Sequence, residues 1–164
     1  MRQLRLFSLA TALSAAVMMV AGAATAAEDT LCGTDETVVF SCHVGKKIVS
    51  LCRPVAGEKA LVYRFGAPSR PELVFPESGH AGGPSFMRSD AVRFGGGSTS
   101  VSFQRGEYRY SVYSQVGRSE GPERTPEVED GVLILRNGKP LRRLVCNDGG
   151  EGFRENINWL PPVK

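Results

Sequence analysis

Histidine is scarce in this sequence: His43 and His80 are the only two residues of this type. A serine or cysteine nucleophile needs a nearby base, most often a histidine. His43 stands in a β-rich run and His80 in a glycine-rich run, and neither lies beside a G-x-S-x-G elbow. Gly95-Gly96-Gly97 lacks the Lys-Ser/Thr pair that would follow it in a phosphate loop. The sequence therefore predicts a protein that is not an enzyme and holds no cofactor and no metal.

Long runs of basic residues are also missing, which excludes the phosphate-binding stripe of a nucleic-acid-binding protein. The chain has 20 Lys and Arg against 17 Asp and Glu, a formal net charge of +3. Loss of Arg2 and Arg5 with a cleaved leader lowers this charge to about +1 (+3 − 2). The isolated pairs Lys46-Lys47 and Arg142-Arg143 are interpreted as turn and strand-surface residues. Nucleic acid is therefore not expected as a partner.

The first 26 residues have the three-part layout of a secretory signal peptide. Arg2 and Arg5 form a cationic head, an apolar stretch covers about residues 7–23, and Ala24-Thr25-Ala26 supplies the small-x-small cleavage pattern. The apolar stretch is marginal for a membrane span of roughly 20 residues. We therefore expect a signal peptide at 1–26, no membrane span after cleavage, and a single β-rich domain at 27–164. The expected location is the periplasm or the medium.

Sustained helical periodicity does not occur, and short β-rich runs separated by turn residues take its place. Gly45-Lys46, Arg105-Gly106 and Asn137-Gly138 predict tight hairpin turns between such runs. The predicted strands are residues 37–44, 47–52, 60–65, 72–75, 91–94, 98–104, 107–114, 132–136 and 141–146. Their number and spacing predict an all-β fold, a single small antiparallel β-barrel or sandwich of about eight strands. Barrel closure would remove exposed sheet edges.

Three further segments are assigned from their composition. Glu77–Pro84 is glycine-rich and Gly117–Glu129 holds two prolines and several charges, so both are predicted as exposed loops. Gly95-Gly96-Gly97 is either a flexible joint or a sharp bend. The tail from Asn147 to Lys164 carries four large apolar residues and is predicted to pack as an ordered arm or a short helix.

All four cysteines follow the predicted cleavage site, and an even number in an exported chain indicates two disulfides. A two-residue turn at Gly45-Lys46 places Cys42 opposite Val49, and a three-residue turn places it opposite Ser50. Either register keeps Cys42 away from Cys52, because a disulfide needs Cβ atoms about 4 Å apart. Of the two remaining connectivities we favour Cys42–Cys146 with Cys32–Cys52, which joins the first core strand to the last.

Two aromatic–arginine clusters are the candidate partner-binding residues. Tyr63-Arg64-Phe65 forms one cluster, and in the other Tyr108 and Tyr110 alternate with Arg109. Tyrosine and arginine are enriched at interface hot spots. The alternative is that Tyr108 and Tyr110 fill the core and Arg109 is solvated. The predicted site comprises Tyr63, Arg64, Tyr108, Arg109 and the loop residue His80.

The run from Leu31-Cys32 through Glu36–Cys42 and Gly45–Lys47 to Ser50–Cys52, with Tyr63–Gly66 and Gly106–Tyr110, resembles a family of small exported bacterial β-proteins. No activity comes with that resemblance. Phe40-Ser41-Cys42, Gly45 and Lys139–Cys146 are similar to the periplasmic inhibitors of c-type lysozyme, which are small β-barrels. The inhibitors carry a Ser-Gly-x-x-Tyr loop, whereas Ser78-Gly79 has no tyrosine at that offset.

These observations predict an exported, non-enzymatic binding domain of the bacterial envelope. Its partner would be an envelope protein or a foreign hydrolase, and a lysozyme inhibitor is the most specific version. The alternatives are a small envelope hydrolase that uses a carboxylate pair, and a structural envelope component without a soluble ligand. The protein is expected to be a monomer.

Overall fold

The computed structural model describes residues 30–56, 60–77, 86–93, 95–118, 122–149 and 151–163. The predicted signal peptide and most of the predicted Glu77–Pro84 loop, with His80, lie outside these residues. The described part contains nine strands and no helix. They are β1 (Glu36–Val44), β2 (Lys47–Pro54), β3 (Val62–Ala67), β4 (Arg70–Phe75), β5 (Phe86–Arg93), β6 (Gly96–Arg105), β7 (Tyr108–Arg118), β8 (Pro126–Arg136) and β9 (Lys139–Val145).

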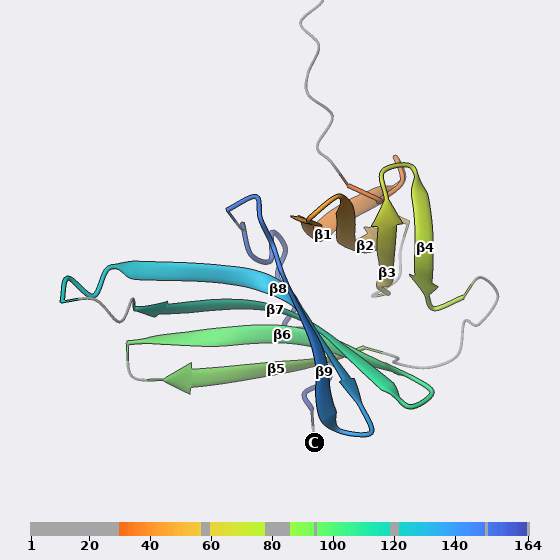
Figure 1. Ribbon diagram of the computed structural model, residues 1–164. Coiled ribbons are helices and arrows are strands. Elements are labelled where there is room, and N and C mark those ends of the chain that lie inside the picture. Colours follow the sequence, from red (N-terminus) through yellow and green to blue (C-terminus); the bar gives the residue numbers. More distant parts are fainter. Residues whose placement is uncertain are drawn as a thin grey trace, which may run out of the picture.

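The strands form two antiparallel sheets (Figure 1). Sheet A has the order β1-β2-β3-β4, and sheet B has the order β5-β6-β7-β8-β9. The sheets are not closed into a barrel, so of the two predicted architectures the sandwich fits. Within each sheet, every strand pairs with the strand that precedes or follows it in the chain. The chain passes from one sheet to the other once, between β4 and β5. Four strand edges therefore remain to be protected in other ways.

Both disulfides have the predicted connectivity, Cys42–Cys146 and Cys32–Cys52. Cys42 lies opposite Val49, as a two-residue turn requires. Cys32–Cys52 ties the N-terminal segment to β2, and Cys42–Cys146 joins β1 of sheet A to the residue after β9 of sheet B. The second bond therefore links two stacked sheets and does not close a barrel. Two disulfides are consistent with an oxidising, exported compartment.

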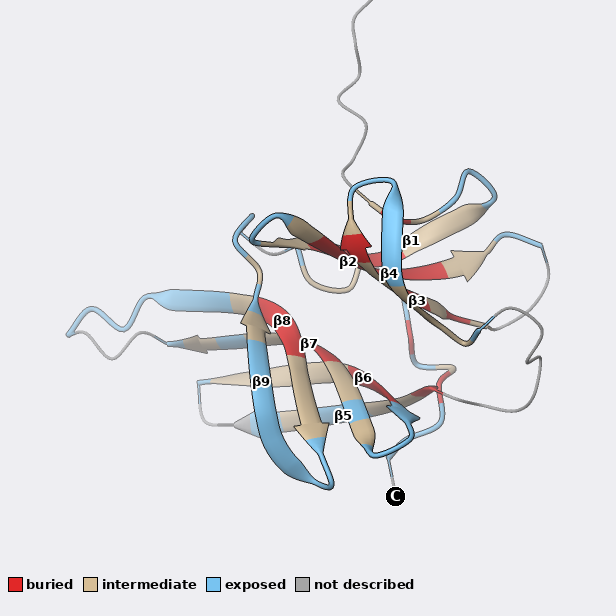
Figure 2. Ribbon diagram, turned by 45° about the vertical axis from the view of Figure 1, so that its right-hand side comes forward, coloured by how far each residue is buried: buried red, intermediate tan, exposed pale blue. Residues whose placement is uncertain are grey.

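The core lies between the two sheets, where buried residues of both meet (Figure 2). Phe103 is its centre, with Phe75 stacked at a ring-centroid distance of 4.3 Å and Tyr110 at 5.0 Å. Val101, Val112 and Val132 are fully buried on neighbouring strands of sheet B. Such a dry layer of aromatic and β-branched residues is the main source of stability in a sandwich of this size.

Two predicted segments differ from the structure. Gly117–Glu129 is not a continuous loop, because β7 runs to Arg118 and β8 begins at Pro126. The first five residues of β5, Phe86–Asp90, were not predicted as strand. The start of β8 was predicted as loop because it contains Pro126 and several charged residues. An exposed strand end tolerates both residue types.

The C-terminal tail is an ordered arm, and its described residues contain no helix. We use "the arm" for residues 151–163. Ile157 and Leu160 are buried in the core, and Phe153 packs on Phe40 at a centroid distance of 5.4 Å. Apolar residues therefore fix the arm although it lacks regular secondary structure.

Candidate functional site

The predicted partner-binding residues do not share one surface. Tyr63 is 1% exposed, and its ring packs against those of Phe103 and Tyr110 at 4.9 and 6.1 Å. Burial, with Tyr110 nearby, raises the pKa of the Tyr63 hydroxyl above its usual range. Tyr63 is thus a core residue and not part of an exposed platform.

Arg64 points to the outer face of sheet A, where Glu36 holds its guanidinium. The hydrogen bonds Nη1–Oε2 and Nη2–Oε1 are 2.5 and 2.9 Å long, and the side chains are only 20% and 9% exposed. The Gly33 amide donates a further bond to Glu36 Oε2 at 2.7 Å. Burial disfavours the carboxylate, but the hydrogen bonds from Arg64 and Gly33 hold the pKa of Glu36 below its ordinary value. Arg64 therefore ties β3 to the start of β1, and Glu36 in turn holds the N-terminal segment through the Gly33 amide.

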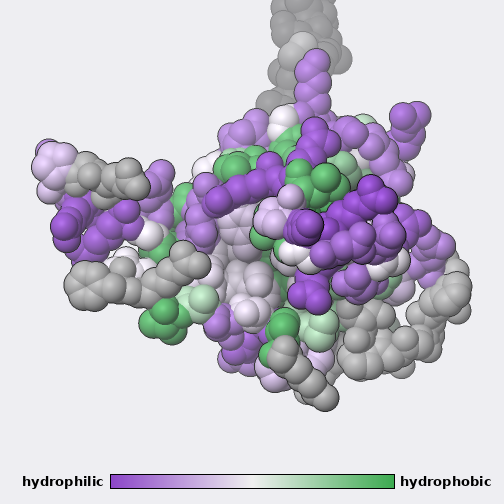
Figure 3. All heavy atoms as spheres, turned by 60° about the horizontal axis from the view of Figure 1, so that its bottom comes forward, coloured by the Kyte–Doolittle hydropathy of each residue, from purple (hydrophilic) through white to green (hydrophobic). Residues whose placement is uncertain are grey.

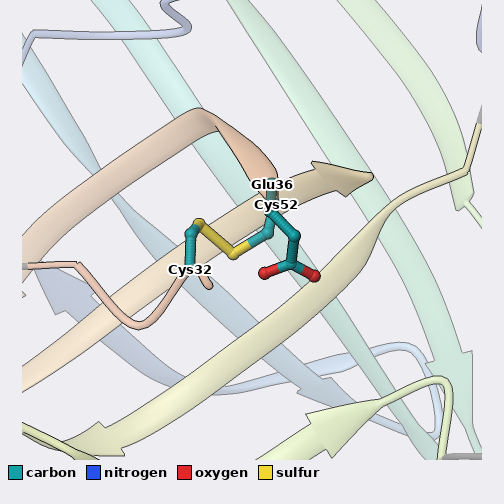
Figure 4. A group of neighbouring side chains, drawn as sticks. All are labelled: Cys32, Glu36 and Cys52. Atoms are coloured by element: carbon teal, nitrogen blue, oxygen red, sulfur yellow. A yellow bond between two sulfur atoms is a disulfide. The ribbon is translucent and has the colours of Figure 1, made fainter. Parts of the chain in front are cut away.

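Glu36 also lies beside the Cys32–Cys52 disulfide (Figure 4). The potential ligand atoms of these three residues lie within 4.8 Å of one another, and so do those of Cys42, Cys146 and Asp148. A cysteine binds a metal as the thiolate, and all four sulfur atoms are joined in S–S bonds. Neither group is a metal site in the oxidised chain.

Tyr108 and Arg109 lie at the hairpin end of β7 and point to opposite faces of sheet B. The Arg136 guanidinium lies 5.7 Å from the centroid of the Tyr108 ring and also pairs with Glu107. Arg109 is exposed. His80 lies outside the described residues. Of the four predicted residues that are described, Arg109 alone presents an exposed side chain.

A different region emerges on the inner face of sheet B. β6, β7 and β8 have 10, 11 and 11 residues, whereas the strands of sheet A have 6 to 9. The far ends of β5 to β8 project beyond sheet A (Figure 1). We call the inner face of this projecting part the overhang. Pairing from β5 to β8 has no register shift, so its side chains stand in straight rows across the sheet.

The inner row of the overhang is polar. It consists of Asp90, Thr99, Ser114 and Asp130, which lie directly opposite one another on successive strands. Thr99 Oγ1 donates to Asp90 Oδ1 at 2.9 Å and Arg88 Nε donates to Oδ2 at 2.7 Å. These bonds, that from Thr99 first, hold the pKa of Asp90 below its ordinary value. Asp90 is therefore a fixed carboxylate.

The arm crosses the polar row from β8 to β5 and forms a wall. At β8 the Gly152 amide donates to Asp130 Oδ2 at 2.6 Å, and at β5 Arg88 bonds to Asn158. The Arg154 amide donates to the Val39 carbonyl at 2.9 Å, so the arm also contacts sheet A. The arm thus separates the core from the overhang.

A groove of about 570 Å³ lies between this wall and the overhang. Eight of its twelve lining residues are polar or charged, and the lining comes from β5, β6, β7 and the arm. The lining residues are Asp90, Gly97, Ser98, Thr99, Ser114, Val116, Phe153, Arg154, Glu155, Asn156, Ile157 and Asn158. Each lining carboxylate is paired with an arginine from outside the lining, Asp90 with Arg88 and Glu155 with Arg53.

The outer row of the overhang is apolar and open to solvent. Val92, Gly97, Val116 and Val128 lie opposite one another across four strands, and we call them the valine row. Val92 is 93% exposed, Val116 47% and Val128 50%. Gly97 leaves a gap between Val92 and Val116. Exposed single valines are common on proteins, whereas an aligned row beside a groove is typical of a contact surface.

Tyrosine and arginine do meet on the outer face of sheet B, through residues that were not predicted. Tyr113 lies over Gly131 and donates to Glu129 at 2.6 Å, and the Arg143 guanidinium stacks 5.3 Å from its ring centroid. Burial, then the bond to Glu129, raises the pKa of Tyr113, although Arg143 opposes this. Hydrophilic residues predominate on the side of the molecule that is shown in Figure 3. Tyr113, Glu129 and Arg143 bond to one another, so their polar groups already have partners within the cluster.

Sequence reasoning missed the overhang because Asp90, Val116, Val128 and Asp130 lay outside the predicted strands. Val128 lies inside the predicted Gly117–Glu129 loop, and Val116 directly precedes it. The available signal was the continued alternation of Tyr110, Val112, Ser114 and Val116, which places these four side chains on one face.

Comparison of the chain with models of protein families, with characterised proteins and with solved structures gives no match. The two resemblances noted in the sequence thus remain expectations. Among the described residues, the structure has no helix of the length and hydrophobicity needed to span a membrane.

Proposed function

We propose that this chain is an exported, non-enzymatic binding domain of the bacterial envelope that holds a polypeptide partner on its overhang. The valine row carries the proposal: three aligned valines stay in water although the same strands bury their other inner-face valines completely. Covering them would remove apolar area from water and so favour association. The neighbouring groove supplies hydroxyl and amide groups that can bind the polar parts of a partner.

The charges of the groove favour binding over hydrolysis. Asp90 and Glu155 both line the groove. A small envelope hydrolase would need two such carboxylates, one as general acid and one as base or nucleophile. A general acid needs a raised pKa, whereas the pKa of Asp90 is lowered. Glu155 is bound to Arg53 at 3.1 Å. Both carboxylates thus already have cationic partners, which suits a fixed polar wall.

Site-specific photo-crosslinking in the producing cells tests the proposal against a structural component without a soluble ligand. A photoreactive residue at Val116 or Val128 should yield a discrete protein adduct. The matched control is Arg109, which is exposed on β7 but points to the outer face. Adducts that form equally from all three positions, or from none, would contradict the overhang as the binding site.

The most specific version of the proposal is a lysozyme inhibitor, and it rests on the resemblance of Phe40–Cys42 and Lys139–Cys146. Muramidase activity of c-, g- and i-type enzymes should then fall on adding micromolar mature protein. Val116→Glu should weaken that inhibition, because it places a charge in the valine row. Absence of inhibition would remove the lysozyme version and leave the crosslinking test of other partners intact.

A further inference from the structure

The four edges of the two sheets are protected to different degrees. An unpaired strand edge offers free N–H and C=O groups, and proteins guard it with proline, charge or a covering segment. β4 carries Arg70, Pro71 and Glu72 at its start, and β9 carries Lys139, Pro140 and two arginines. Both edges thus have the usual protection.

The β1 edge is covered by the chain that follows β9. The Asn147 amide donates to the His43 carbonyl at 2.9 Å, and the His43 amide donates to Asp148 at 2.6 Å. Further along, the Arg154 amide bonds to the Val39 carbonyl. This edge is closed to any further strand.

The β5 edge is covered in its first half only. The Arg88 amide donates to the Pro161 carbonyl and the Val163 amide donates to the Arg88 carbonyl, both at 2.8 Å, as in a short parallel bridge. Backbone groups alternate in direction along a strand, so those of Asp90 and Val92 also point outward. Within the described residues, no backbone partner bonds to them.

Between Ser89 and Val92, β5 also lacks the usual guards. This segment contains no proline, and its one charged side chain with described contacts, Asp90, is turned over the sheet by its bond to Thr99. Val92 is the most exposed large hydrophobic residue in the described chain. A strand added here would extend the valine row by one residue and would cover Val92.

We propose that the Ser89–Val92 edge of β5 pairs with an extended segment of a partner polypeptide, whose side chain beside Val92 is aliphatic. This inference rests on the proposed function, since it states how the partner is held. The arm already binds the same strand edge in extended form at Arg88, so the edge accepts an added segment. The main-chain groups of Asp90 and Val92 supply affinity, and the valine row selects an apolar residue.

A labelled, blocked peptide of alternating threonine and valine, with a lysine at each end, serves as the probe. Fluorescence anisotropy should show saturable binding to the mature protein. Val92→Pro removes the outward N–H without touching the bonds to β6 and should weaken binding about tenfold, the effect of one lost hydrogen bond. Val92→Thr keeps that N–H and should weaken binding less.

Two further probes are N-methylated on the valine amides or on the threonine amides. Only one set of amides can face β5, so one probe should lose binding and the other should keep it. This comparison uses the unaltered protein, so it holds even where Val92→Pro fails to fold. Equal binding by both methylated probes, loss of both, or no binding of the parent probe would overturn the inference.

Sedimentation of the mature protein distinguishes a second copy from a foreign segment. Self-association that Val92→Pro abolishes would assign the edge to another copy and would overturn the inference. A Val116 adduct together with a probe that does not bind would refute the edge pairing and leave the proposed function standing. Failure of both would refute both.

Discussion

The side chains on the inner face of sheet B are buried at one end of the strands and exposed at the other. Under sheet A, Phe103 is 1% exposed and Val112 is fully buried, whereas two rows further along β7 Val116 is 47% exposed. Strand pairing, alternation and residue type are the same in both places. The difference arises because sheet A is shorter and the arm closes the sandwich at the polar row. Burial in this fold is therefore decided by what lies above the sheet, not by the strand itself.

The boundary between the two halves is made of polar groups. Asp130 is 2% exposed and binds the Gly152 amide, and Asp90 binds Thr99 and Arg88. Hydrogen bonds to buried polar groups fix the position of the groups that donate them. Asp130 makes this bond through Oδ2, and its Oδ1 is buried without a partner among the described residues. The polar row thus holds the arm and leaves the valine row outside the core.

Truncation of the core centre should produce the largest loss of stability. Phe103→Ala removes the ring that stacks on Phe75 and Tyr110, and the cavity should lower the free energy of unfolding by about 3–5 kcal/mol. Urea denaturation followed by circular dichroism measures this. A loss below about 1 kcal/mol would mean that the covered half is not tightly packed.

Removal of the bond between the sheets should rank second. The double variant Cys42→Ala, Cys146→Ala opens a loop with a sequence separation of 104 and should lower the free energy of unfolding by about 2–5 kcal/mol. The matched control is Cys32→Ala, Cys52→Ala, with a separation of 20, which should have a smaller effect because the loop is shorter. Equal losses in both variants would show that loop length does not set the stabilisation.

Local signals in the sequence predicted much of sheet A and the hairpins of sheet B. A tight turn at Gly45-Lys46 predicted Cys42 opposite Val49 or Ser50, and either register excluded the Cys42–Cys52 bond; the structure has Val49. The choice between the two remaining connectivities came instead from the preference for a bond between the first and last core strands, which the structure shows. Asn137-Gly138 likewise marked the β8–β9 hairpin, and both residues have positive φ. The type of a tight turn depends on the residues within the turn, so the sequence predicts it directly.

Long-range placement could not be read in the same way. Nothing near Tyr63 or Arg64 shows that the ring is buried against Phe103 or that Glu36, 28 residues away, binds the guanidinium. The overhang depends on the relative lengths of two sheets and on the path of the arm. These are properties of the assembled fold, so the site emerged only with the structure.

Acidification should reduce the contribution of Glu36 to the free energy of unfolding more than that of Asp90. The pKa of Glu36 is lowered in the folded state, so its contribution is fully present above the ordinary glutamate pKa and is lost as pH falls through the folded value. The stability gap between the wild type and Glu36→Gln should therefore shrink as pH falls below about 5. Asp90→Asn should show a smaller gap, because the Asp90 side chain is 42% exposed and its ion pair is screened. Urea midpoints across the acidic range measure both, and a larger gap for Asp90→Asn would reverse the ranking.

Two isosteric substitutions on one strand give the most direct test of the comparison, and the one in the overhang should have the smallest effect of all. Val112→Thr buries a hydroxyl in the dry core and should lower the free energy of unfolding by about 1–3 kcal/mol. Val116→Thr, on the same face of β7, should change it by less than about 0.5 kcal/mol, since water already reaches that side chain. Urea denaturation at several protein concentrations measures both. Equal losses at all concentrations would mean that the overhang is covered within the chain, whereas a loss for Val116→Thr that grows with concentration would show that a second copy covers the valine row.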